Sequence, residues 1–267
     1  MKKFIRKIFL KLGFDIIKKT HSLEFINLLT HKRYVEKNIT LLNEEFTIPD
    51  AVSFYHSYHE IFTQNIYKFN SNNKMPTIID CGSNCGTSIV YFKKLFPNCS
   101  IIGFEADSNI YRILKKNIDH RNYSNVKINN LAIWKEETEI EFFSEGSDGG
   151  RITNNYDNKS KKVVRTIRLS SVLKDISVDM LKIDIEGAET EVLLECKDYL
   201  NNVKNIFIEY HSFLDSTQTL DVILQILKEK GFRYHIHHQF ISTIPFVSRK
   251  LQLGMDLQLN IFAYKHN

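Results

Sequence analysis

The sequence has few cysteines, few prolines and no long apolar run. Four cysteines stand among 267 residues and none belongs to a CxxC pair, so a zinc site built on such pairs is excluded. No apolar stretch approaches the ~20 residues that a membrane-spanning helix needs. The first apolar stretch is interrupted by Arg6, Lys7 and Lys11, which does not fit a signal peptide. We therefore expect a reduced, cytoplasmic protein.

Positive charge is concentrated at the start of the chain. Residues 1–20 hold seven lysines and arginines and one aspartate, whereas the other 247 residues sum to −1 within a total of +5. A near-neutral body does not fit a generally basic nucleic-acid binder, so we expect no nucleic-acid partner. The segment predicts an amphipathic helix, for which two interpretations stay open: peripheral contact with an anionic membrane surface, or packing on the body.

The chain divides into a basic amphipathic helix with a helical cap, residues 1–74, and a core of alternating strand and helix patterns, residues 75–267. Alternation predicts an α/β fold with a mostly parallel, doubly wound sheet and helices on both faces. Strands are expected at 77–80, 101–105, 126–134, 180–185, 206–210, 232–237 and 259–264. Two extended segments, 139–143 and 163–169, predict an inserted β-hairpin. The polar loop around 146–151 fits either the tip of that hairpin or a flap over a substrate.

A glycine loop at residues 80–86 (DCGSNCG) follows the first core strand and opens a helix. Glycines there let the backbone approach a ligand closely. Glu105 ends the next strand, 19 residues beyond Gly86, where a carboxylate can accept both hydroxyl hydrogens of a ribose. Asn84 stands where a dinucleotide loop has its second glycine, which disfavours a pyrophosphate. Asp80 at the start of the loop instead suits the ammonium group of S-adenosylmethionine.

In these blocks the sequence resembles the FkbM family of methyltransferases, over residues 46–210. The matching blocks are IDCGSNCG at 79–86, GFEAD at 103–107, NLA at 130–132, DMLKIDIEGAE at 179–189 and IEYH at 208–211. The resemblance implies a Rossmann-like class I fold. It also implies methyl transfer from S-adenosylmethionine, commonly to a hydroxyl oxygen of a sugar or natural product, with S-adenosylhomocysteine as the second product.

The resemblance also implies roles for individual residues when it is carried over by position. Asp80, Gly82 and Gly86 would hold the methionine part of the cofactor, Glu105 the ribose, and residues 130–132 the adenine edge. The full set of predicted cofactor-binding residues is Asp80, Gly82, Ser83, Asn84, Gly86, Glu105, Ala106, Asn130, Leu131, Ala132 and Asp184.

Charged residues recur at the ends of two apolar strands. Lys182, Asp184 and Glu186 share one side of their strand because residues two apart point the same way, and so do Glu209 and His211. Neighbouring parallel strands bring such groups to the carboxyl edge of the sheet, where ligands bind. We predict His211 and Asp184 as candidates for the base that removes the acceptor proton, with Glu186 and Glu209 orienting or polarising. A structural ion-pair network around Lys182 is the alternative. No metal is predicted, because the sequence shows no dedicated metal spacing.

Two other function classes stay open for this fold. One is a nicotinamide-dependent oxidoreductase, and the other is a non-catalytic binding module. A nucleic-acid methyltransferase is disfavoured because the chain lacks a basic face and its four prolines are isolated. We expect a small molecule or a glycan as the acceptor, and the basic arm favours a lipid-linked saccharide at the inner membrane surface. The sequence does not indicate an oligomeric state.

Overall fold

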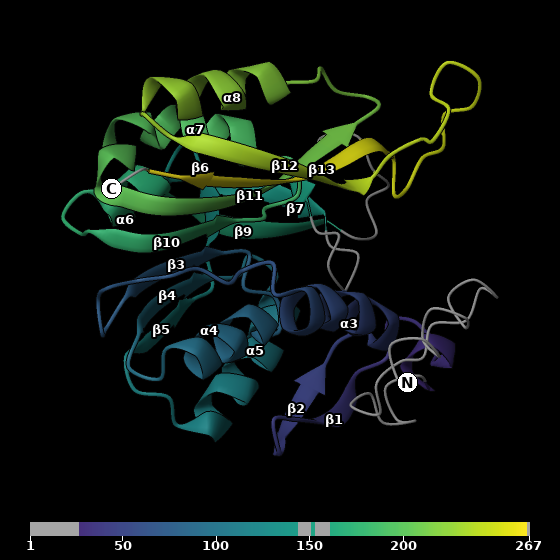
Figure 1. Ribbon diagram of the computed structural model, residues 1–267. Coiled ribbons are helices and arrows are strands. Elements are labelled where there is room, and N and C mark those ends of the chain that lie inside the picture. Colours follow the sequence, from purple (N-terminus) through teal and green to yellow (C-terminus); the bar gives the residue numbers. More distant parts are fainter. Residues whose placement is uncertain (1–26, 144–150, 153–160, 266–267) are drawn as a thin grey trace, which may run out of the picture.

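The computed structural model describes residues 27–143, 151–152 and 161–265, and a seven-stranded sheet forms its centre (Figure 1). The strand order is β12-β13-β11-β10-β3-β4-β5. Five neighbouring strands from β11 to β5 are parallel, and β13 is antiparallel to both of its neighbours. The strands are β3 (Thr77–Cys81), β4 (Ser100–Phe104), β5 (Val126–Asn129), β10 (Val178–Ile183), β11 (Val203–Phe213), β12 (Arg233–Phe240) and β13 (Met255–Tyr264). The predicted mostly parallel α/β sheet is confirmed.

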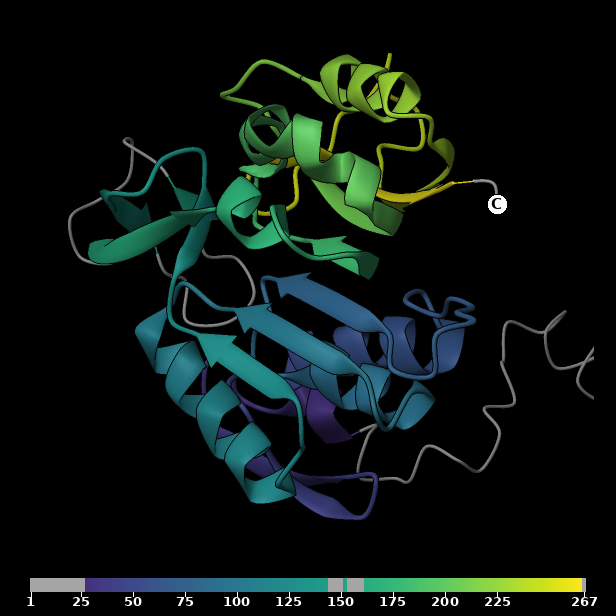
Figure 2. The ribbon, with the colours of Figure 1, turned by 90° about the vertical axis from the view of Figure 1, so that its left-hand side faces the viewer.

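Helices cover both faces of this sheet, as a doubly wound fold requires (Figures 1 and 2). Ile78 and Ile79 are neighbours in β3 but pack into different apolar clusters, because successive strand residues point to opposite faces. One cluster contains Phe92 of α4, and the other contains Val192 of α7. The helices are α4 (Thr87–Leu95), α5 (Ser108–Arg121), α6 (Leu169–Leu173), α7 (Glu189–Cys196), the 3-10 helix η3 (Lys197–Asn202) and α8 (Leu220–Glu229).

A second, four-stranded sheet is inserted between β5 and β10 (Figure 2). It contains β6 (Ala132–Trp134), β7 (Glu139–Phe143), β8 (Arg151–Ile152) and β9 (Lys161–Arg168). Strands β7 and β9 pair antiparallel, so the predicted hairpin is confirmed. The predicted single strand over 126–134 is wrong in one respect: its first half joins the central sheet and its second half pairs with β9. Both halves are apolar, and only the tertiary fold decides which partner each half meets. The predicted loop tip at 146–150 lies outside the described residues.

The N-terminal cap, η1 to η2, contains a hairpin as well as helices. Its elements are the 3-10 helix η1 (Asn27–Thr30), β1 (Lys37–Leu41), β2 (Glu44–Ile48), α3 (Ala51–Tyr58) and the π-helix η2 (His59–Gln64). Strands β1 and β2 pair antiparallel. Phe46 and Ile48 are fully buried in a cluster that also contains Val90 and Ile113 of the core helices. The cap therefore packs directly on α4 and α5. The predicted basic helix at residues 1–20 lies outside the described residues.

Across the described part of the chain, no helix is both long and apolar enough to span a bilayer.

Asn117 of α5 joins the cap to the glycine loop. Its side chain is 2% exposed, accepts a hydrogen bond from the Thr47 amide and donates to the carbonyls of Thr47 and Cys85, each at 2.8 Å. We expect Asn117→Ala to lower the free energy of unfolding by about 2–4 kcal/mol, because three buried backbone groups lose their partner. Urea denaturation measures this change. Asn109→Ala, at an exposed position of the same helix, is the matched control. An equal effect of the two substitutions would contradict the assignment.

Candidate active site

A cavity of about 650 Å³ opens at the carboxyl edge of the central sheet. Its floor is formed by the ends of β3, β4, β10 and β11, which include the switch point where the chain passes from one half of the sheet to the other. One wall comes from α3 and η2 of the cap, and another from residues 252–258 at the start of β13. Segments far apart in the sequence therefore enclose one space.

Gly82 lies where the glycine loop meets the end of β10. Its φ of +86° is in the left-handed region, and a Cβ added there would lie 1.9 Å from the Asp184 carbonyl oxygen. The Asp184 amide in turn donates to the Cys81 carbonyl at 3.1 Å. Only glycine fits this contact, so the loop requires it for packing as well as for conformation.

The amides of the glycine loop are all used within the protein. Gly82 and Ser83 donate to the Phe104 carbonyl, Gly86 donates to Ser83, and Cys85 donates to the Asn84 side chain. The Asn84 amide donates to the Glu105 carboxylate at 2.9 Å. Residues 82–86 therefore offer no unpaired amide to a negative group, and they do not form a phosphate cradle.

Glu105 lies on the cavity wall at the end of β4, as the sequence predicts. Its two carboxylate oxygens accept from the amides of Asn84 and Asp107, both at 2.9 Å. Burial raises the pKa of Glu105 to about 7, against the opposing effect of these hydrogen bonds. The two amides fix the carboxylate in place while its remaining lone pairs can accept hydroxyl hydrogens from a ligand.

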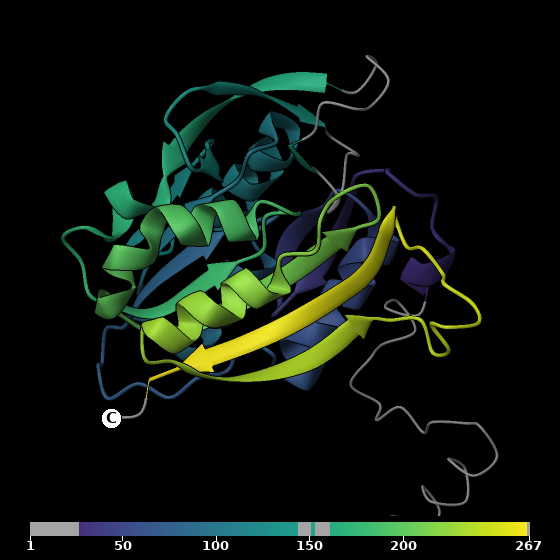
Figure 3. The same cartoon turned by 90° about the horizontal axis from the view of Figure 1, so that it is seen from above.

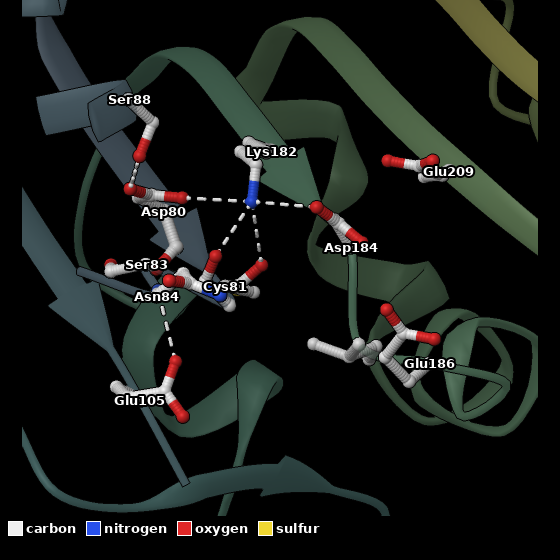
Figure 4. A network of polar contacts seen from close by, with 12 residues as sticks. Asp80, Cys81, Ser83, Asn84, Ser88, Glu105, Lys182, Asp184, Glu186 and Glu209 are labelled. Atoms are coloured by element: carbon white, nitrogen blue, oxygen red, sulfur yellow. Dashed lines mark hydrogen bonds and ion pairs between the residues drawn. The ribbon is translucent and has the colours of Figure 1, made fainter. Parts of the chain in front are cut away.

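Lys182 is the centre of a buried ion-pair network (Figure 4). Its ammonium lies 3.3 Å from Asp80, 3.2 Å from Asp184 and 2.7 Å from the Gly82 carbonyl oxygen. Burial opposes the charged form, but Asp184 and Asp80 hold the pKa of Lys182 well above its usual value. This lysine, which the sequence offered only as a member of a structural network, ties the glycine loop to β10.

Asp80 lies beneath the glycine loop and does not line the cavity. Its side chain is fully buried between Lys182 and the Ser88 hydroxyl, which donates to it. The sequence predicted that Asp80 binds the ammonium of the cofactor directly. In the structure the ammonium that Asp80 meets belongs to Lys182, so Asp80 acts on the cavity through that residue.

Glu189 positions the turn after β10 and the end of β11. Its buried carboxylate accepts from the amides of Ile185 and Gly187 and meets His211 Nδ1 at 2.9 Å. Glu186, held at a φ of +55° in that turn, lies 3.6 Å from His211 Nε2. Although burial opposes its charged form, Glu186 and Glu189 hold the pKa of His211 well above its usual value. His211 thus lies behind the cavity wall with a carboxylate at each ring nitrogen, and it does not face the cavity.

Glu209 is the carboxylate that faces the cavity from β11. Burial and then the nearby Asp184 raise its pKa to about 8. Gln258 of β13 donates to Glu209 at 2.6 Å and its amide nitrogen lies 3.3 Å from His211 Nε2. The sequence offered no signal for Gln258, because it reaches the site only through the antiparallel pairing of the last strand with β11.

The structure brings most of the predicted residues together. Those that line the cavity are Gly82, Ser83, Asn84, Glu105, Ala106, Leu131, Ala132, Asp184, Glu186 and Glu209. Those that do not are Asp80, Gly86, Asn130 and His211. Gly86 faces Leu114 of α5, where an added Cβ would lie 2.9 Å from that side chain. The side-chain amide of Asn130 donates to the backbone carbonyls of Glu105 and Ala106, so Asn130 supports the cavity wall from behind.

Three residues of the site have the spacing of a metal centre. One ligand atom each from Asp184, Glu186 and His211 lies within 4.8 Å of the others. Each of the three already faces a group of opposite charge: Asp184 faces Lys182, and Glu186 faces His211. Lys182 and His211 are shared with two further carboxylates, Asp80 and Glu189, so the protein neutralises the negative charge of this cluster only in part.

Comparison with known proteins gives matches to methyltransferases. A family model described as "Methyltransferase FkbM domain" matches residues 80–234. Methyltransferase sdnD of Sordaria araneosa is 25% identical over 211 residues, which cover 66% of this chain and 80% of that protein. Methyltransferase 1 of Beauveria bassiana (strain ARSEF 2860) is 24% identical over 206 residues, which cover 68% and 81%. Among solved structures, M. jannaschii TYW2 in complex with AdoMet has a TM-score of 0.48 at 11% identity, with 87% of this chain and 86% of that chain covered.

The Lys182 network yields a stability prediction. Lys182→Met leaves Asp80 buried without its cation, so we expect a loss of about 3–5 kcal/mol in the free energy of unfolding. The double variant Asp80→Asn with Lys182→Met removes the stranded charge as well, and we expect it to recover at least half of that loss. Denaturant titration of the wild type, both single variants and the double variant gives the coupling energy. Additive losses would show that Asp80 and Lys182 do not depend on each other.

Proposed function

The chain belongs to the FkbM family of methyltransferases, and we propose that it transfers the methyl group of S-adenosylmethionine to a hydroxyl oxygen of a sugar, glycan or related small molecule. The observation that carries the proposal is the cavity itself. It places an ionisable carboxylate, Glu209, beside Asp184 at the sheet edge and across the floor from Glu105. Family membership leaves no support for the nicotinamide-dependent alternative, and the fully bonded amides of residues 82–86 also disfavour a pyrophosphate.

The residues on the cavity wall fit the parts of S-adenosylmethionine. Glu105 can accept both ribose hydroxyls, and Leu131, Ala132 and Ile133 supply an apolar surface for the adenine. The negative charge of Asp184 and its neighbours favours a sulfonium. When bound, the cofactor supplies a methyl carbon on that positively charged sulfur and leaves as S-adenosylhomocysteine.

Glu209 is the base in this proposal, in place of His211 and Asp184, the two candidates that the sequence predicted. A carboxylate with a pKa of about 8 accepts a proton near neutral pH more readily than an ordinary glutamate does. Glu209 would take the proton of the acceptor hydroxyl, whose oxygen would receive the methyl group that S-adenosylmethionine supplies, with S-adenosylhomocysteine as the leaving thioether. Gln258 holds the Glu209 carboxylate toward the cavity, and Lys182 holds Asp184.

A hydroxyl-rich acceptor is favoured by the polar character of the outer walls. His56, Ser57 and Glu60 of the cap face the cavity, and so do Gln239 and Gln258 of the last two strands. Side chains of this kind orient a ligand through hydrogen bonds, as a saccharide requires. The non-catalytic alternative predicts cofactor binding without transfer to any such acceptor.

Cofactor binding should depend on pH through Glu105. Because its pKa is about 7, the carboxylate is protonated below that pH and then loses part of its capacity to accept ribose hydroxyls. We expect calorimetry with S-adenosylhomocysteine to show tighter binding at pH 8.5 than at pH 6. Glu105→Gln should weaken binding by roughly tenfold to a hundredfold and remove most of this pH dependence. A variant that binds as the wild type does would rule out the ribose contact.

Catalysis should depend on pH through Glu209, and in the same direction. Only the ionised carboxylate takes a proton, so kcat should rise with pH through about 8. We expect Glu209→Gln to lower kcat by roughly 10²–10⁴-fold and to leave the affinity for S-adenosylhomocysteine within about threefold. Methyl transfer to acceptors selected from a screen of glycan fractions measures this. Glu191→Gln, at a surface position paired with Lys135, is the control. An unchanged pH profile in Glu209→Gln would exclude Glu209 as the base.

A further inference from the structure

The loop between β12 and β13, residues 241–254, projects from the body of the protein (Figures 1 and 3). It carries several exposed apolar side chains. Phe246 is 97% exposed and Val247 is 83% exposed, and Ile244 and Leu251 are each more than half exposed. Large apolar side chains gathered on one projecting loop mark a surface that contacts something else.

The tip of this loop has a defined conformation. The amides of Val247 and Ser248 donate to the Ile244 carbonyl, both at 2.9 Å, which closes a turn around Phe246. Arg249 Nε donates to the Pro245 carbonyl at 3.0 Å. Because the turn is closed by its own hydrogen bonds, Phe246 and Val247 are presented outward before any partner binds.

The charge of the loop identifies the kind of partner. Arg249 and Lys250 are exposed next to the apolar tip, and residues 241–255 contain no aspartate or glutamate. The first 20 residues add a net charge of +6 to the same chain. Apolar side chains flanked by lysine and arginine are typical of segments that lie in the interface of an anionic bilayer, where each cation adds to the attraction.

The base of the loop is part of the cavity. Gln252 and Leu253 line it together with Met255, the first residue of β13. An external surface that binds the tip of the loop would therefore lie near the cavity, on the side where β12 and β13 form the cavity wall. An acceptor carried by a lipid could reach the cavity from such a surface without leaving it.

We propose that residues 241–254 dock the protein on an anionic lipid bilayer, with Phe246 and Val247 in the interfacial layer and Arg249 and Lys250 at the headgroup phosphates. The acceptor that fits this arrangement is a lipid-linked saccharide presented at the membrane surface. The docking stands on the loop alone, whereas the identity of the acceptor also rests on the proposed function.

Vesicle flotation of the full chain tests the docking. The wild type should float with vesicles of phosphatidylcholine and phosphatidylglycerol and not with phosphatidylcholine alone. Phe246→Ser with Val247→Ser should weaken binding to the anionic vesicles by roughly tenfold or more, because the interfacial apolar contact is lost. Arg249→Gln with Lys250→Gln should weaken it to a similar degree and reduce its salt dependence. Val163→Ser, which removes an apolar side chain that is 67% exposed on β9, should bind as the wild type does.

Two results would overturn the docking. One is undiminished flotation of Phe246→Ser with Val247→Ser, which would assign all lipid binding to other parts of the chain. The other is self-association without lipid, seen by sedimentation and abolished by the same pair of substitutions, which would make a second copy the occupant of the loop.

Methyl transfer separates the docking from the acceptor. With a lipid-linked saccharide in anionic vesicles, the loop variant should lose activity, and with a soluble saccharide it should keep wild-type activity. Equal activity of the two proteins on the lipid-linked acceptor would overturn the acceptor assignment. No transfer by the wild type to either acceptor would refute the proposed function, while flotation would still decide the docking.

Discussion

The site depends on one buried ammonium. Lys182 joins Asp80 of β3 to Asp184 at the end of β10 and also holds the Gly82 carbonyl of the glycine loop. Strands β3 and β10 are neighbours at the switch point of the sheet, and the two halves of the sheet extend from them in opposite directions. A buried charge needs partners, and here the partners lie on the segments that shape the cavity floor. The ion-pair network is thus structural and at the same time fixes how Asp184 faces the cavity.

A second buried carboxylate, Glu189, organises the side of the cavity formed by β11. Glu189 holds the turn that carries Glu186 and meets the His211 ring from behind. Because His211 lies behind the wall with carboxylates at both ring nitrogens, Glu209 is the carboxylate that β11 presents to the cavity. Lys182 is among the residues that line the cavity and His211 lies behind its wall, while the carboxylates of Asp184, Glu186 and Glu209 line it. That polarity suits a ligand that carries a sulfonium.

The outer half of the cavity is built from helices, strands and a loop that lie far apart in the sequence. The cap contributes α3 and η2, and the last two strands contribute Gln258 and the base of the 241–254 loop. Strand β13 pairs with β11, which brings Gln258 to Glu209, and it also pairs with β12, to which the projecting 241–254 loop connects it (Figure 3). One strand thus links the cavity wall to the loop of the proposed lipid contact.

The sequence alone determined the α/β class, the glycine loop, Glu105 and the acidic strand ends, because these follow from local periodicity and from residue types that must lie at the end of a strand. Tertiary structure decided the rest. It paired Asp80 with Lys182, and His211 with Glu189, because ion pairing depends on which segments become neighbours in the fold. It also divided residues 126–134 between two sheets and placed Gln258 in the site. Burial and charge pairing are properties of the folded chain, and a pattern along one strand does not contain them.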